Sequence, residues 1–153
     1  MKRSICGALA LVLAACASAA PGSVFERSLG TASGTDALER SVRVLRLFQY
    51  EVEREEQTPR LITVQTRWKR RSPFEDEAAL GISAAETRVT VTARFRQETV
   101  AGALYGVSLS MENRVQLGST TEWLGDHASP MYRTYADSLA TGLQRELTIG
   151  IRR

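Results

Sequence analysis

The sequence predicts an α+β fold, a two-layer sandwich in which a four-stranded antiparallel meander carries two helices on one face. Apolar and polar residues alternate strictly along residues 88–96 and 104–117, which is the period of strands with one dry face and one wet face. Near both ends of the domain, apolar residues instead recur every three or four positions, the spacing of amphipathic helices. Short connections between these segments favour antiparallel neighbours in the sheet.

The first predicted helix begins at Asp36. Its side chain is a suitable cap, and Glu39 lies three positions later, as in a capping box. Four apolar residues then follow at helical spacing: Leu38, Val42, Leu45 and Phe48. We therefore expect a helix with one buried stripe, which ends before the period changes to two near Tyr50.

Four strands are expected after this helix. The first is short, from Tyr50 to Glu53, and a polar turn at residues 55–59 follows it. The second runs from Leu61 to Arg71, and the strict alternations at 88–96 and 104–117 are the third and fourth. In the second strand, the alternation assigns Ile62, Val64, Thr66 and Trp68 to the dry face and Arg67, Lys69 and Arg71 to the wet face.

The last helix is expected to begin at Ser129 and Pro130. Serine is a favoured cap, and proline is well tolerated at the first helical position. Its buried side is predicted to carry Met131, Tyr135, Leu139, Leu143 and Leu147. Both helices would then lie across the dry face of the sheet.

The edges of such a meander would be its first and fourth strands. The first is rich in glutamate, a charged edge that discourages pairing with another chain. The fourth would be the better template for strand addition by a partner, unless residues 24–29 or 148–151 cover it.

The amino terminus has the features of a secretory signal peptide. Lys2 and Arg3 precede an apolar run of about ten residues, too short to span a bilayer, which needs roughly 20 apolar residues. The run ends in Leu13-Ala14-Ala15-Cys16, which resembles the lipobox of bacterial lipoproteins. The alternatives are an ordinary cleaved signal with a coincidental cysteine, or a buried helix.

The lipoprotein resemblance implies cleavage before Cys16 and acylation of that cysteine, including by palmitate. We then expect a signal peptide at residues 1–15, a flexible tether at 16–35 and a single domain at 36–153. Because residue 17 is not aspartate, the resemblance also implies sorting to the outer membrane, with the domain facing the periplasm. The membrane is therefore one expected partner, through the lipid anchor.

Composition and motifs favour a protein that is not an enzyme. His127 is the only histidine, and its neighbours Asp126 and Ser129 share one loop, where adjacent residues do not normally form a catalytic triad. The acidic run Glu75-Asp76-Glu77 lacks the ligand spacing of a calcium loop, and no zinc set is present. We expect no metal and no cofactor. The net charge of +3 includes Lys2 and Arg3 of the signal, so charge gives no case for nucleic acid.

The predicted wet face gathers basic side chains from the second and third strands, with Glu112 of the fourth strand placed to pair with Arg88. As a functional surface, it would bind an acidic protein partner, lipid headgroups or anionic glycolipid. As an ordinary solvated face of an arginine-rich protein, it would bind nothing. The candidate residues are Arg67, Lys69, Arg71, Arg88, Arg94 and Arg96.

A lipobox followed by helix, strands and helix resembles, in element order alone, the lipoproteins of lipopolysaccharide assembly. The resemblance implies a binding or scaffolding accessory of outer-membrane biogenesis, anchored in the cell envelope. The alternative is a stand-alone periplasmic binder of anionic glycolipid or glycan, which would use the arginine-rich face.

Overall fold

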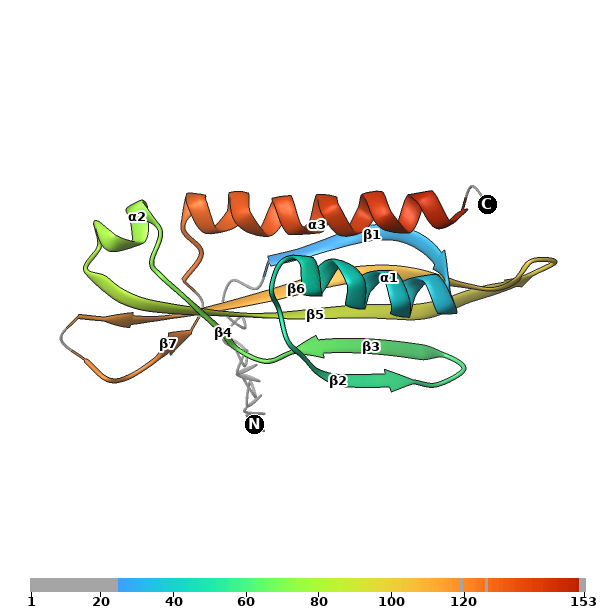
Figure 1. The fold of residues 1–153 in the computed structure, drawn as a ribbon, viewed down its shortest axis with the longest axis horizontal. Coiled ribbons are helices and arrows are strands. Elements are labelled where there is room, and N and C mark those ends of the chain that lie inside the picture. The colour runs from blue at the N-terminus through green and yellow to red at the C-terminus, as the bar shows by residue number, and fades with distance from the viewer. Residues whose placement is uncertain (1–24, 119, 126, 152–153) are drawn as a thin grey trace, which may run out of the picture.

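The computed structural model describes residues 25–118, 120–125 and 127–151. The chain enters through one strand and one helix, continues through a series of strands with a short helical turn, and ends in a long helix (Figure 1). In chain order the elements are β1 (Phe25–Ser33), α1 (Gly34–Leu47), β2 (Val52–Gln57), β3 (Leu61–Thr66), β4 (Lys69–Arg71), α2 (Glu75–Ala78), β5 (Ile82–Thr99), β6 (Gly102–Leu117), β7 (Leu124–Gly125) and α3 (Pro130–Ile151).

Among the described residues the strands form one sheet of seven strands, in which every pairing is antiparallel. The main order is β1-β6-β5-β3-β2, with β4 paired to β5 and β7 to β6. The long β5–β6 hairpin runs the length of the molecule (Figure 1). The α+β class is confirmed, whereas the four-stranded meander is corrected: β2, β3, β5 and β6 follow it, and further strands extend it.

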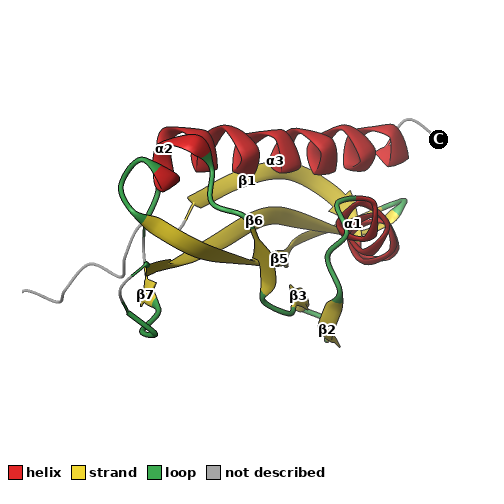
Figure 2. Ribbon diagram, turned by 60° about the vertical axis from the view of Figure 1, so that its left-hand side comes forward, coloured by secondary structure: helices red, strands yellow, loops and turns green. Residues whose placement is uncertain are grey.

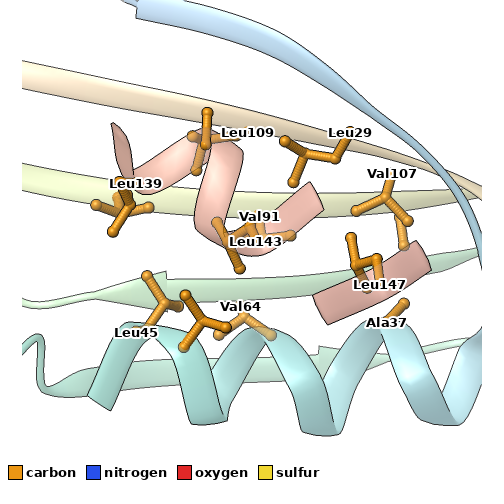
Figure 3. Close-up of a cluster of buried hydrophobic side chains, with 14 of the residues drawn as sticks. Leu29, Ala37, Leu45, Val64, Val91, Val107, Leu109, Leu139, Leu143 and Leu147 are labelled. Carbon is orange, nitrogen blue, oxygen red and sulfur yellow. The ribbon is translucent and has the colours of Figure 1, made fainter. Parts of the chain in front are cut away.

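Helices α1 and α3 pack together over one face of the sheet (Figures 1 and 2). Between them and the strands lies the main hydrophobic core, to which Leu45 of α1, Leu143 of α3 and Val91 of β5 contribute (Figure 3). We call the opposite face of the sheet the open face, because neither helix covers it.

The expected tether is corrected at its carboxyl end, because residues 25–33 form β1 beside β6 and residues 34–35 begin α1. Leu29 and Ala32 of β1 are buried in the core, so this segment belongs to the domain. A bulge between Ser28 and Gly30 interrupts the pairing, and Gly30 adopts a φ of 102°, which glycine tolerates. Because β1 covers β6, the edge expected to accept a partner strand is closed.

Helix α1 begins earlier than predicted. Ser33 is its cap, and the Ser33 hydroxyl accepts a hydrogen bond of 3.1 Å from the backbone N–H of Asp36. Asp36 instead lies in the first turn, where its carboxylate forms an ion pair of 2.6 Å with Arg40. The capping box expected at Asp36 is therefore wrong, although the helix and its buried Leu45 are present.

The predicted second strand is divided in two. After Thr66 the chain leaves the ladder: the N–H of Arg67 donates to the Glu51 carbonyl, and pairing with β5 resumes at Lys69. This interruption reverses the alternation, so Trp68 lies on the open face, against Arg88. Lys69 consequently turns towards the helices.

The start of α3 is confirmed. The Ser129 hydroxyl accepts a hydrogen bond of 3.1 Å from the N–H of Tyr132, and Pro130 is the first helical residue. The buried stripe includes the expected Leu139, Leu143 and Leu147, but Tyr132 replaces Met131, which is 40% exposed. Within the described ranges, no helix combines the length and the apolar character that a membrane span requires.

Candidate functional site on the open face of the sheet

The middle of the open face consists of short polar side chains, which we call the polar floor. Strand register aligns them in two adjacent rows that cross β1, β6, β5 and β3. Side chains on one face of a sheet repeat every two residues, so each row is separated from the next by about 7 Å. The rows are Ser28, Ser108, Thr92 and Thr63, and next to them Glu26, Ser110, Thr90 and Gln65.

A hollow of about 310 Å³ lies in the polar floor where β1, β6 and β5 meet. Hydroxyl groups supply much of its lining, and Arg94 and Glu26 supply opposite charges. Such a lining can donate and accept hydrogen bonds as well as attract an anion. The lining residues are Glu26, Arg27, Ser28, Thr92, Arg94, Ser108, Leu109 and Ser110.

Arg94 and Arg96 lie at the end of the polar floor nearest the β5–β6 hairpin, and Arg94 is part of the lining of the hollow. Arg94 pairs in register with Gly106, and a Cβ at Gly106 would come within 2.5 Å of the Arg96 Nε. The missing side chain at Gly106 therefore allows the Arg96 guanidinium to lie across β6, beside Arg94. Both arginines are exposed, and neither forms an ion pair within the described part of the chain.

At the end of the open face away from the β5–β6 hairpin, the charged side chains form ion pairs and their charges cancel. Arg88 forms the expected ion pair with Glu112, at 2.8 Å, and Arg114 forms one with Glu86, at 2.6 Å. The Trp68 ring lies against both guanidinium groups, with its centroid 4.7 Å from Arg88 Cζ and 4.1 Å from Arg114 Cζ. Carboxylates and an aromatic ring already contact these two arginines, so we assign this end of the open face a structural role.

Two further candidate residues, Arg67 and Lys69, do not lie in the basic patch on the open face that the sequence predicts. Arg67 lies beside the sheet, 3.6 Å from a Glu51 carboxylate oxygen. Lys69 points to the helix-covered side, where its ammonium donates to the Phe48 carbonyl at 2.7 Å and lies over the Tyr50 ring. Burial lowers the pKa of Lys69.

Arg71 is also on the helix-covered side, in a buried ion pair with Glu77 of α2. Its two terminal nitrogens donate to the two Glu77 oxygens at 2.6 and 2.7 Å, and Asn113 donates to the same carboxylate at 3.3 Å. Burial alone would raise the pKa of Glu77, but the hydrogen bonds from Arg71 and from the Phe74 N–H outweigh it, so the pKa lies below its ordinary value. Of the six candidates, only Arg88, Arg94 and Arg96 lie on the open face, and of these only Arg94 and Arg96 lie near each other, because Arg88 is six residues away along β5 and paired with Glu112.

The loop that contains His127 forms hydrogen bonds that stabilise the fold. The Asn113 amide donates to the His127 carbonyl at 2.6 Å, and the Ser129 hydroxyl, besides capping α3, donates to Asp76 at 3.0 Å. Among the residues described, no three His, Cys, Asp or Glu side chains are grouped as metal ligands. Asp126 and Cys16, the expected lipidation site, lie outside the described residues.

The fold and the candidate site together define a class: a small two-layer α+β domain whose open sheet face carries a hydroxyl-lined hollow beside two arginines. A comparison with protein-family models finds no match, and a comparison with curated protein sequences finds none either.

Proposed function

We propose that this chain is a non-enzymatic lipoprotein of the cell envelope, anchored in the outer membrane, and a binding or scaffolding accessory of outer-membrane biogenesis. The observation that carries the proposal is the amino-terminal sequence, a charged start and an apolar run ending in Leu13-Ala14-Ala15-Cys16, which resembles a lipoprotein signal and precedes a folded α+β unit. The buried ionisable groups support a non-catalytic role, since Glu77 and Arg71 neutralise each other and the Tyr50 hydroxyl is hydrogen-bonded to Thr87 at 2.8 Å.

The binding surface in this proposal is the open face. Arg94 and Arg96 support it, because two exposed cations without acidic partners in the described residues are available to an acidic ligand. A second candidate function rests on the same two residues: a stand-alone binder of anionic glycolipid or glycan. The two functions differ in whether a protein partner is bound in stoichiometric amount.

The anchor is tested at Cys16. The mature amino terminus is expected to be an acylated peptide beginning at Cys16, detectable by mass spectrometry. Cys16→Ser removes the thiol that accepts the lipid, so the variant is expected in the soluble exported fraction or as unprocessed precursor. An unmodified terminus at another position would refute the anchor and the outer-membrane location together.

The binding surface is tested by reversing its free charges. Arg94→Glu combined with Arg96→Glu is expected to remove most of the envelope protein that co-purifies from detergent-solubilised membranes, because the acidic partner is then repelled. The matched control is Arg43→Glu with Arg46→Glu, which changes two exposed arginines of α1 on the other side of the molecule. Equal profiles for wild type and both double variants would contradict a role for the open face, and the absence of any stoichiometric partner would favour the second candidate.

A further inference from the structure

We propose that the hollow between β1, β6 and β5 binds the phosphate-bearing, hydroxylated headgroup of a lipid in the same membrane that holds the anchor. This inference rests on the proposed lipid anchor and adds a membrane lipid as a ligand of the open face, besides the acidic protein partner proposed above. It combines three observations: the chemistry of the hollow, the two free arginines beside it, and its position next to the point where the chain enters the domain.

The lining suits a headgroup that carries both charge and hydroxyl groups. Ser28, Ser108 and Ser110 present hydroxyls, each of which can donate one hydrogen bond and accept others. Glu26, at the β1 side of the hollow, adds a carboxylate that accepts from ligand hydroxyls and disfavours a purely anionic ligand. The volume of about 310 Å³ admits a small polar group of this kind.

Arg94 and Arg96 determine the sign of the ligand's charge. Guanidinium groups match phosphate oxygens with two parallel hydrogen bonds and are less strongly hydrated than ammonium groups. Arg94 lines the hollow, and the Arg96 guanidinium lies next to it, against Gly106, the register partner of Arg94. Two adjacent guanidinium groups present several donors to one phosphate, which fits a phosphodiester better than a neutral sugar.

The start of β1 places the hollow near the bilayer. Glu26 and Ser28, which line the hollow, directly follow Phe25, the first described residue. The chain from Cys16 to Phe25 can span at most about 30 Å even when fully extended. A lipid on Cys16 therefore keeps the hollow within that distance of the membrane surface, so lipid headgroups are the phosphates closest to it.

The test uses the chain from residue 16 with Cys16→Ser, so that no covalent lipid contributes to membrane binding. Vesicles of phosphatidylcholine are prepared with and without phosphatidylglycerol, whose headgroup has a phosphodiester and two hydroxyls, and binding is measured by co-sedimentation. We expect binding that requires phosphatidylglycerol. Arg94→Gln with Arg96→Gln is expected to weaken it roughly 10- to 30-fold.

Two matched variants separate a site from diffuse attraction. Arg43→Gln with Arg46→Gln removes the same charge from α1 and is expected to change binding less than about twofold. Diffuse attraction of basic residues to an anionic membrane would instead weaken binding equally in both arginine pairs. Ser108→Gln leaves the net charge unchanged but fills the hollow, and is expected to weaken binding about as much as the loss of both arginines. Ser108 is exposed, so thermal unfolding should show an intact fold.

Three results would overturn the headgroup site: equal binding to both kinds of vesicle, equal losses from the two arginine pairs, or full binding by Ser108→Gln. Tight binding of free glycerol 3-phosphate without binding to vesicles would also overturn it, because the source of the phosphate would then be soluble. An acylated Cys16 together with any of these results would leave the proposed anchor standing and remove only the headgroup site.

Discussion

Val91→Asp is expected to unfold the domain or to lower its free energy of unfolding by several kcal/mol. Val91 is 2% exposed and pairs in register with Val64 and Leu109, both of which are also buried. An aspartate there would place a carboxylate against the core beneath α1 and α3, with no cation opposite it among its register partners. Because small domains are stable by only about 5–15 kcal/mol, the loss should be evident in chemical or thermal unfolding.

The matched control is Thr92→Asp, one residue along the same strand. Thr92 is half-buried on the open face and lines the hollow with Arg94, so the new carboxylate remains in contact with water and near a cation. We expect a change of less than about 1 kcal/mol. Equal losses in the two variants would contradict the assignment of the two faces of β5.

This pair of variants depends on a part of the fold that sequence patterning predicts well. In β5 the alternation is unbroken from residue 88 to 94, and in β6 from 105 to 115, because both strands are central and have one covered face. It ends at Phe95, which the alternation assigns to the dry face but which is 38% exposed. Ser129 and Pro130 likewise identify the start of α3, since their effects on a helix terminus are local. The Arg88–Glu112 pair follows directly from the same register.

Strand β1 is predicted only in part: residues 24–29 are identified as a segment that could cover the fourth strand, but residues 30–33 are assigned to the tether. The bulge between Ser28 and Gly30 shifts the alternation, and the residues around it are small and polar, as in a linker. Its pairing with β6 joins segments about 80 residues apart, which no local pattern reports. The hollow is not predicted from the sequence for the same reason, because Glu26 and Ser28 of β1 form one of its sides.

The predicted basic patch is larger than the observed one, because the prediction treats residues 61–71 as one uninterrupted strand. The break at Arg67 and Trp68 exchanges the faces on which later side chains lie. A simple period-two pattern cannot predict such an exchange. The one sequence feature that could have indicated the break is Trp68, an aromatic residue between charged neighbours on the predicted dry face. In the structure its ring lies on the open face, against Arg88 and Arg114. Arg71 and Glu77, by contrast, look like ordinary surface charges until the fold buries them together.

Glu77→Gln is expected to lower the free energy of unfolding at neutral pH by about 3–5 kcal/mol, because removal of one partner leaves the other charge of a buried ion pair uncompensated. Glu77 is fully buried, and the side chain of Arg71 is 12% exposed. The same carboxylate accepts from the Phe74 N–H at 2.9 Å, so the substitution also weakens the link between β4 and α2. Glu75→Gln, at an exposed position of the same helix, should cost well under 1 kcal/mol.

The pH dependence provides the second readout for Glu77. Its pKa in the folded protein is lower than the ordinary value of 4.5, so its ionisation stabilises the fold at pH values above 4.5. That contribution decreases as the pH falls from 4.5 through the folded pKa, where protonation breaks the pair with Arg71. The difference in unfolding free energy between wild type and Glu77→Gln should therefore be largest near neutral pH and shrink in acid. A difference that is constant with pH would show that Glu77 stabilises the domain through packing and neutral hydrogen bonds instead of through its charge.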